Sequence, residues 1–279
     1  MLSPGFILFT LFVLFAIGFS FWLSFHKWNI LEPAKPYVGL ANYKQAVHDP
    51  DLGKAIINTL FFTSTIPIGL AVGLFLALLL NQQIRARGFF RTMFYIPVIT
   101  PLVVAAIIWK WVYGGDYGLL NYYLLKAHLI QNPVLWLSNY NIAMWAVIVM
   151  SIWKGAGFTM VVYLAGLQAI PQEYYEAAEV DGASAWQKLR RITFPLLAPT
   201  TFFLVIISVI ASFQVFTQIY IMTQGGPAGR TTTIVYLIYN TAFKFFQMGY
   251  ASALAYVLFG MVFIFTFLQM RYYTQRIQY

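Results

Sequence analysis

The sequence predicts an all-α integral membrane protein with six transmembrane helices and a cytoplasmic helix-turn-helix between the fourth and fifth spans. Three observations support this fold class. Of the 279 residues, 61% are hydrophobic and only 9% are charged, which leaves too little polar surface to cover a soluble core. Apolar runs of about 20 residues, the length that crosses a bilayer, recur along the chain. Between two of these runs, residues 171–195 hold half of the eight acidic residues.

The whole chain, residues 1–279, is expected to form a single transmembrane domain. The six expected spans are residues 6–25, 56–80, 92–111, 142–167, 196–222 and 250–270. In the second span, Pro67 is expected to produce a kink, and Gly69 and Gly73 have the spacing that lets two helices approach closely. The third span contains Pro97 and Pro101, and the fifth is interrupted by polar residues.

The arginines indicate how the spans are oriented. Seven of the eight arginines lie in three short segments, one of which carries Arg85, Arg87 and Arg91 without any acid. Short loops rich in basic residues stay on the cytoplasmic side of a membrane. We therefore expect these segments and both termini to be cytoplasmic, with outward loops at residues 26–54, 113–140 and 224–248. The first span lacks the basic flank of a secretory signal and is expected to be retained, although the natural chain could begin further upstream.

The charged stretch, residues 171–195, has the pattern of two short helices. Glu173 and Glu176 suit the positive end of a first helix. Gly182 is expected to break that helix, and Pro195 and Pro199 are expected to limit the second one. The result is a polar helix-turn-helix between two spans.

Sequence motifs for catalysis or nucleotide binding are absent. The histidines, His26, His48 and His128, are isolated from one another, and the chain has no cysteine. No phosphate-binding G-x-x-x-x-G-K-[ST] loop, no G-x-G-x-x-G motif and no G-x-S-x-G elbow occurs. The net charge of +9 does not indicate a nucleic-acid partner, because the basic residues are scattered among apolar spans. We expect no enzyme activity and no cofactor in this chain, so energy from ATP would have to come through a partner.

The acids of the charged stretch, Glu173, Glu176, Glu179 and Asp181, have three interpretations. They could form a solvated helix face, or they could bind a metal ion, although the spacing of a calcium loop is missing and we expect no metal site. They could also form a docking surface for basic residues of a cytosolic protein.

The charged stretch resembles the E-A-A loop of the membrane subunits of bacterial ABC importers. Phe194 and Leu189 depart from the usual family residues, but both keep an apolar side chain. The residues that carry the resemblance, and that would dock the ATPase, are Glu173, Glu176, Ala177, Ala178, Asp181, Gly182, Ala183, Ile192 and Pro195.

Further motifs are similar to those of binding-protein-dependent sugar permeases of the maltose and glycerol-3-phosphate type, and resemble the first of the two unlike permeases in such systems. They are YVGLANY at residues 37–43, NTL at 58–60, FRTMFYIP at 90–97, LAGLQ at 164–168, TQGGP at 223–227 and GYASA at 249–253.

The resemblance implies a multi-pass subunit of a prokaryotic inner membrane. Its implied partners are a second, unlike permease, two copies of a cytosolic ATPase that bind ATP and Mg, and an extracytoplasmic solute-binding protein. Glu176 would make the charged contact with the ATPase, Gly182 would permit the turn, and the alanines would allow close approach.

Candidate residues of a substrate path lie in the fourth and fifth spans. A charge inside an apolar span, as at Lys154, is costly unless it is paired, so it marks either a functional site or a lysine that snorkels or binds a backbone carbonyl. Gln214 and Gln218 are one helical turn apart and could donate hydrogen bonds to a sugar hydroxyl. The full set of candidates is Trp153, Lys154, Phe213, Gln214, Phe216, Gln218 and Tyr220.

Other functions remain open from the sequence. The solute could be a phosphorylated polyol such as glycerol 3-phosphate, or a peptide, since the E-A-A motif is common to such importers. From different classes, the chain could be a secondary carrier or channel that works alone, or a membrane enzyme. Neither the sugar nor the identity of the partner proteins can be read from the residues.

Overall fold

A computed structural model of the chain describes residues 3–82 and 85–276, and this part is almost entirely helical. Extended contacts within it are limited to isolated bridges between His26 and Tyr37 and between Asn29 and Gln247. The helices, with η marking π-helical turns, are α1 (Ser3–Phe9), η1 (Thr10–Leu14), α2 (Phe15–Leu23), α3 (Ala41–His48), α4 (Pro50–Phe62), α5 (Thr65–Asn81), α6 (Arg87–Ile99), α7 (Leu102–Val112), α8 (Leu119–Lys126), α9 (Ala143–Gln168), α10 (Glu173–Val180), α11 (Ala185–Lys188), η2 (Leu189–Thr193), α12 (Phe194–Leu196), α13 (Ala198–Phe213), η3 (Ile219–Thr223), α14 (Ile234–Tyr239), η4 (Asn240–Lys244) and α15 (Met248–Arg276).

Within the described residues, four helical segments are long and apolar enough to cross a membrane: Gly5–Leu23, Pro50–Asn81, Ala143–Gln168 and Met248–Arg271. Two further pairs of helices pass the same criteria together but are bent. They are Arg87–Ile99 with Leu102–Val112, and Ala185–Leu196 with Ala198–Phe213. If each bent pair is one span, the total reaches the six that the sequence predicts.

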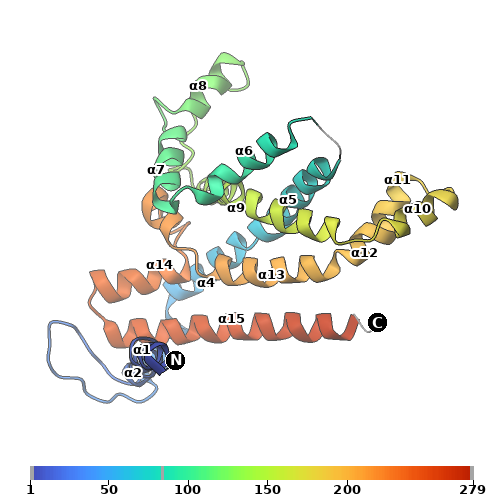
Figure 1. Ribbon diagram of the computed structural model, residues 1–279. Helices are drawn as coiled ribbons and strands as arrows, with labels where there is room; N and C mark the ends of the chain where they lie inside the picture. The colour runs from blue at the N-terminus through green and yellow to red at the C-terminus, as the bar shows by residue number, and fades with distance from the viewer. Residues whose placement is uncertain (1–2, 83–84, 277–279) are drawn as a thin grey trace.

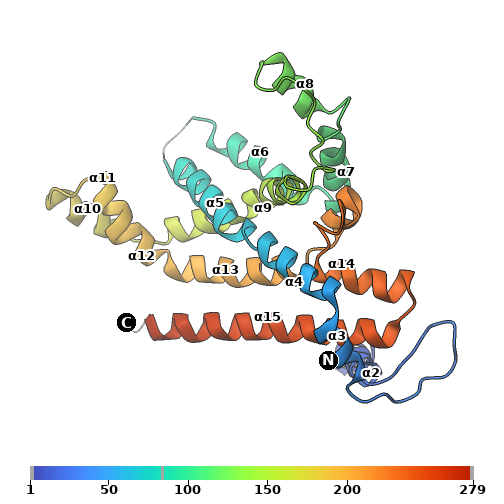
Figure 2. The ribbon, with the colours of Figure 1, turned by 180° about the vertical axis from the view of Figure 1, so that it is seen from behind.

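The long helix α9 lies at the centre of the fold and packs against α5, α6 and α13 (Figure 1). α15 runs alongside α13 and α14. In both views, α10 and α11 lie at the end of the molecule opposite α14, which is also the end towards which α15 runs (Figure 2). The charged helices therefore project from one end of the bundle.

The buried core consists of three clusters. The first surrounds Ile148 and joins α9 to α7, η3 and α14. The second surrounds Met160 and joins α9 to α5 and α13, and the third surrounds Leu254 and joins α15 to α3, α4 and α14. Many large apolar side chains remain outside these clusters, including most of α1 and α2, where only 6% of the apolar segment is buried. Such a surface is suited to lipid or to another apolar helix.

The second apolar helix begins earlier than the sequence predicts. Residue 50 is expected in a loop, but Asp49 caps α4 by accepting a hydrogen bond from the Asp51 amide at 2.8 Å, and Pro50 occupies the first turn. Proline is favoured there because it has no N–H to leave unpaired. A break occurs at residues 63–64, one turn before Pro67, because the proline cannot donate to the Thr63 carbonyl. The amide of Ile66 donates to that carbonyl instead, at 2.9 Å.

The expected glycine packing face is confirmed at one of its two positions. A Cβ atom on Gly73 would overlap the side chain of Thr159 on α9, so only glycine allows this approach of α5. Gly69 has open space where a Cβ would lie.

The third predicted span is not one straight helix. α6 begins at Arg87 and ends at Ile99, and α7 continues after a bend of 98°. The bend falls at Thr100 and Pro101, where the proline removes an amide donor and favours an extended conformation in the residue before it. Pro97, by contrast, lies inside α6.

The fifth predicted span, residues 196–222, is also broken. Helical structure runs through Pro195 to Leu196, so Pro195 does not end the second helix of the charged stretch as expected. The π-helical turn η2 precedes this proline, and the 61° bend comes at Leu197, just before Pro199. α13 then ends at Phe213. Two residues later, the Val215 carbonyl accepts a hydrogen bond from the Thr233 hydroxyl at 3.0 Å.

The first apolar helix takes a direction of its own. In Figure 1, α1 and α2 are seen nearly end-on, whereas α15 lies across the view. The Tyr256 hydroxyl of α15 donates to the Ile17 carbonyl at 2.6 Å, which links the two helices. The location of both termini on one side of a membrane stays a prediction.

Candidate functional site

The charged stretch forms a helical hairpin, residues 171–196, in which α10 is followed by a turn and by α11, η2 and α12. Gly182 has φ +74°, a left-handed conformation that glycine adopts without strain, so its predicted role in the turn is confirmed. The Ala183 amide donates to the Ala178 carbonyl at 2.8 Å. Ser184 and Gln187 then form a capping box, with reciprocal hydrogen bonds of 2.7 and 3.3 Å, that starts α11.

Two contacts brace the arms of the hairpin against each other. The Lys188 ammonium lies 2.6 Å from a carboxylate oxygen of Glu179, and the hydroxyls of Tyr175 and Thr193 are 3.0 Å apart. Because these contacts join the two arms, the hairpin can move as one body.

The outer surface of the hairpin is free of packing in the described chain. No residue of α10 is buried, and Val180 and Trp186 are 89% and 64% exposed. Glu179 is paired with Lys188, whereas Glu173, Glu176 and Asp181 make no ion pair with any described residue. Exposed apolar side chains beside free carboxylates are the pattern of a protein-interaction surface.

A pocket of about 340 Å³ opens at the turn of the hairpin, with Ala178, Asp181, Gly182, Ala183 and Ile192 among its lining residues. The structure brings the predicted docking residues together at one end of the molecule. Those that are exposed are Glu173, Glu176, Ala177, Asp181, Gly182 and Pro195; those that are half-buried are Ala178, Ala183 and Ile192.

A second pocket, of about 180 Å³, lies between α5, α9 and α13. Its polar lining includes Ser151, Thr159 and Ser208, and Gln218 also reaches it. Gln214 does not line it. The expectation that Gln214 and Gln218 lie one turn apart on one helix is wrong, because α13 ends at Phe213 and residues 214–216 are not helical, so Gln218 lies in the next helical segment.

Lys154 is bound to a backbone carbonyl, one of the alternatives that the sequence left open. Its ammonium donates to the Val98 carbonyl at 2.8 Å, next to the break between α6 and α7. A cation is favoured at the negative end of a helix, and here it binds a carbonyl of the last turn of α6. One turn along α9, a Cβ atom on Gly157 would overlap the Phe94 carbonyl oxygen, so α6 and α9 are in backbone contact. Trp153 packs against Trp109 at 5.5 Å between ring centroids.

The candidate aromatic residues divide into two groups. Phe213 is 1% exposed and packs against Phe265, so it is a core residue and does not face the pocket. Phe216 and Tyr220 stack on each other at 5.4 Å, and both contact Tyr239, at 5.0 and 5.4 Å. Sequence reasoning missed Tyr239, since only the tertiary fold brings α14 beside η3.

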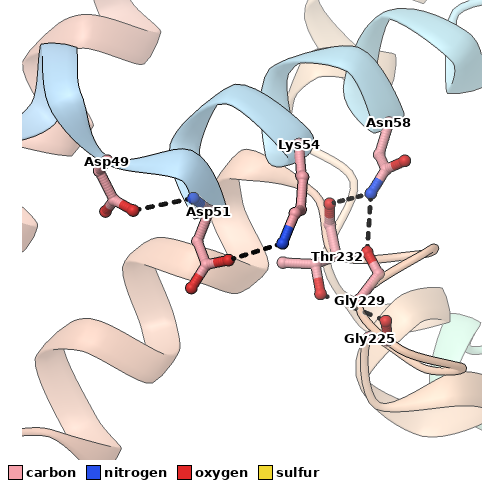
Figure 3. A network of polar contacts seen from close by, with 7 residues as sticks. All are labelled: Asp49, Asp51, Lys54, Asn58, Gly225, Gly229 and Thr232. Atoms are coloured by element: carbon pink, nitrogen blue, oxygen red, sulfur yellow. Dashed lines mark hydrogen bonds and ion pairs between the residues drawn. The ribbon is translucent and has the colours of Figure 1, made fainter.

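The loop after η3 is tied to α4, as Figure 3 shows. The Asn58 amide donates to the carbonyls of Gly229 and Thr232, both at 2.9 Å. In addition, the Thr59 hydroxyl accepts a hydrogen bond from the Ile234 amide at 3.1 Å. The Gly-Gly-Pro motif forms a turn, with Gly225 at φ +80°. Two motifs that are far apart in the sequence therefore form one structural unit.

Asn121 organises the loop between α7 and α9 and was missed by sequence reasoning. Its amide nitrogen donates to the Gly114, Gly115 and Val134 carbonyls, and its oxygen accepts from the Val134 amide and from the Trp136 indole at 2.8 Å. A lone asparagine in the apolar run LLNYYLL was the available signal, since a buried amide needs partners.

Comparison with known proteins gives consistent matches. The sequence model for the family described as "Binding-protein-dependent transport system inner membrane component" matches residues 69–279. A probable ABC transporter permease protein of Pyrococcus horikoshii is 37% identical, with 92% of this chain and 88% of that protein covered. The trehalose/maltose transport system permease protein of Thermococcus litoralis is 34% identical, with 97% and 91% covered. The sn-glycerol-3-phosphate transport system permease protein of Agrobacterium fabrum is 32% identical, with 100% and 95% covered.

Two solved structures have a similar fold. A chain of a bacterial ABC transporter involved in the import of the acidic polysaccharide alginate superposes with a TM-score of 0.87 at 25% identity, covering 100% of this chain and 95% of that one. A chain of a bacterial alginate ABC transporter in complex with an alginate pentasaccharide-bound periplasmic protein superposes with a TM-score of 0.81 at 25% identity, covering 96% and 91%.

Proposed function

The chain belongs to the family of binding-protein-dependent transport system inner membrane components, and on this basis we propose that it imports a sugar or oligosaccharide. The observation that carries the proposal is the match over nearly the whole length with a trehalose/maltose permease, together with the fold shared with an alginate importer. The chain acts as the first of two unlike permeases in a heterodimer. An extracytoplasmic solute-binding protein delivers the sugar to it.

The hairpin at residues 171–196 is the docking site for a cytosolic ATPase, of which the complex contains two copies. Its free carboxylates and exposed apolar side chains support this role, because no described part of the chain covers them. ATP and its Mg ion bind to that ATPase. Glu176 makes the charged contact, and the bracing between the two arms lets the hairpin pass a rotation of the ATPase on to α9 and α13.

In the membrane, the chain forms a single domain of six spans, two of which are the bent helix pairs. The hairpin, the arginine-rich loop at residues 85–91 and both termini face the cytoplasm. The arginine distribution supports this orientation.

The solute passes between α5, α9 and α13, where the pocket lined by Ser208 and Gln218 lies. Hydroxyl and amide groups in an otherwise apolar pocket suit the hydroxyls of a sugar. Phe216, which is half-buried, and Tyr220, which is exposed, do not line this pocket but offer stacking surfaces further along the path. Alternating access follows if the bent spans rock around this pocket.

A second candidate solute is glycerol 3-phosphate, which the similarity to a permease for that compound favours. Uptake of labelled maltose and of labelled glycerol 3-phosphate by the same complex distinguishes the two. A carrier that works alone would transport its solute without ATP.

The docking role is tested by Glu176→Lys, with charge reversal at the exposed Asp51 on α4 as the matched control. Glu176→Lys is expected to abolish ATP-driven uptake and to release the ATPase during purification, while the chain still inserts into the membrane. Asp51→Lys is expected to retain both the ATPase and uptake. Normal uptake in the Glu176→Lys variant would contradict the docking role, and an ATPase that never co-purifies with the unmodified chain would contradict the importer.

A further inference from the structure

A pocket of about 520 Å³ lies away from the path between the spans, between the loop after α2, helix α3 and the start of α15. It is larger than the central pocket and the pocket at the turn of the hairpin. Its volume is within the range of small-molecule sites, about 300–1,000 Å³. Neither the docking role of the hairpin nor the solute path through the central pocket involves this pocket.

The pocket combines aromatic walls with amide groups. Trp28, Phe245 and Tyr250 supply the aromatic surfaces, and Gln45 and Gln247 are exposed at its opening. Neither glutamine side chain makes a hydrogen bond within the described chain, so both are available to a ligand. Aromatic faces next to free amides match the two sides of a sugar ring, which are apolar C–H groups and hydroxyls.

The charges at the pocket are balanced. Lys27 and Glu32 both line it, and neither forms an ion pair with a described residue. One cation and one anion favour a neutral ligand rich in hydroxyls over a phosphate or a carboxylate, which would lie close to Glu32.

The walls are held in place before any ligand arrives. The Trp28 indole donates to the Glu32 carbonyl at 3.2 Å, and the Lys35 ammonium lies 4.5 Å from the Trp28 ring centroid. Asn42 is buried, and its amide nitrogen donates to two carbonyls, those of Ser24 at 2.8 Å and His26 at 3.0 Å. The Asn42 amide oxygen accepts no hydrogen bond in the described chain, so it is free to accept one from a ligand hydroxyl.

The floor of the pocket is equally fixed. The Tyr250 hydroxyl donates to the Asp49 carboxylate at 2.5 Å, and Asp49 also caps α4. A preformed pocket binds its ligand without a large ordering cost.

We propose that this pocket, built by Trp28, Asn42, Gln45, Gln247 and Tyr250, binds a neutral saccharide at the outer end of the permease, separately from the path between the spans. The inference rests on the proposed function, because a sugar importer brings saccharides to this side. It adds a second site at which sugar is held near the entrance.

The chain has no cysteine, so a single introduced cysteine reports on one place. The full complex is reconstituted in nanodiscs as a Gln247→Cys variant and treated with a membrane-impermeant maleimide, and the labelled chain is quantified by mass spectrometry. Tyr117→Cys, at a position that is 90% exposed in the loop before α8, is the matched control. Maltotriose and lactose are the probes.

The Gln247→Cys variant lacks one amide of the pocket but keeps Trp28, Asn42, Gln45 and Tyr250. Both sugars are therefore expected to slow its labelling in a saturable manner and to leave the control unaffected. Adding Gln45→Ala is expected to raise the sugar concentration for half-protection by about three- to tenfold, the effect of one lost hydrogen bond. Gln218→Ala in the central pocket is expected to leave that concentration unchanged.

Four results would overturn the inference. The first two are that neither sugar slows labelling, and that both sugars slow labelling of the control to the same extent. The other two are that the maleimide does not label Gln247→Cys at all, and that protection depends on the anionic lipid content of the nanodisc and not on the sugar. ATP-driven uptake of the same sugars by the same complex, reconstituted in sealed liposomes, separates this inference from the proposed function. Intact uptake without protection refutes only the pocket, whereas absence of uptake for every sugar refutes the importer.

Discussion

The contact between α6 and α9 at Gly157 leads to a sharp stability prediction. A Cβ atom at this position would overlap the Phe94 carbonyl oxygen and would lie 2.9 Å from a methyl carbon of Val98 and 3.0 Å from the Phe94 carbonyl carbon. Carbon atoms prefer separations of about 3.5–4.0 Å, so α6 would have to retreat by about 0.5–1 Å. Because two of the three neighbours are backbone atoms, a rotamer change cannot relieve the overlap.

Gly155 is the matched control for Gly157→Ala. It lies on the same helix, two residues away, and a Cβ there would meet nothing within 4 Å. Replacing glycine by alanine inside a helix stabilises it by about 0.5–1 kcal/mol, and this gain is common to both variants. Overpacking costs about 1–3 kcal/mol and applies only at Gly157. The Gly157→Ala variant should therefore be less stable than Gly155→Ala by about 1–3 kcal/mol.

The measurement is thermal unfolding of each variant complex in the same detergent, followed by tryptophan fluorescence and by the fraction that stays monodisperse. For a chain of this size, 1 kcal/mol corresponds to about 2–4 °C in the midpoint. The Gly157→Ala midpoint should lie several degrees below that of Gly155→Ala. Equal midpoints would refute the inference that the two backbones are in contact.

Three further predictions concern single side chains. Asn121→Ala should destabilise the loop between α7 and α9 by about 2–3 kcal/mol, because it leaves buried polar groups unpaired, and it should speed proteolysis of that loop. The control Asn139→Ala, at an exposed turn, should change neither the stability nor the proteolysis rate. Gly182 has a left-handed backbone conformation that valine adopts only with strain, so Gly182→Val should lower ATP-driven uptake. Gly182→Asn should retain more uptake, because asparagine tolerates that conformation. Equal uptake by the two variants would argue against strain at the turn. Lys154→Met should lower the unfolding midpoint, because it leaves the Val98 carbonyl without its donor. Lys154→Arg should recover part of the lost midpoint, since arginine can also donate to that carbonyl. A Lys154→Met variant as stable as the unmodified chain would mean that this hydrogen bond is dispensable.

Local sequence signals located the hairpin correctly. The helix preference for acids in the first turn and the need for glycine at a left-handed turn act within a few residues, so Glu173, Glu176 and Gly182 could be placed without any tertiary information. Hydropathy likewise located the apolar segments, because a bilayer sets their length.

Breaks within the spans were harder to predict. A proline removes one donor, but whether the helix bends depends on which neighbour satisfies the freed carbonyls. Pro97 and Pro195 lie within helical structure, while the chain bends next to Pro101 and Pro199. The break after Phe213 has no proline at all, and the carbonyl beside it is bound by Thr233 from a later loop.

The sequence by itself determined the class of this protein, the positions of its apolar segments, the charged hairpin and the family to which it is similar, because each of these depends on composition or on residues close together in the chain. Only the tertiary structure decided that Lys154 binds the Val98 carbonyl, that Phe213 is buried, and that Gln218 reaches the central pocket without Gln214. These facts depend on groups more than fifty residues apart or on how a broken helix is completed by a neighbour. Pairing over such distances is set by packing, which no local pattern specifies.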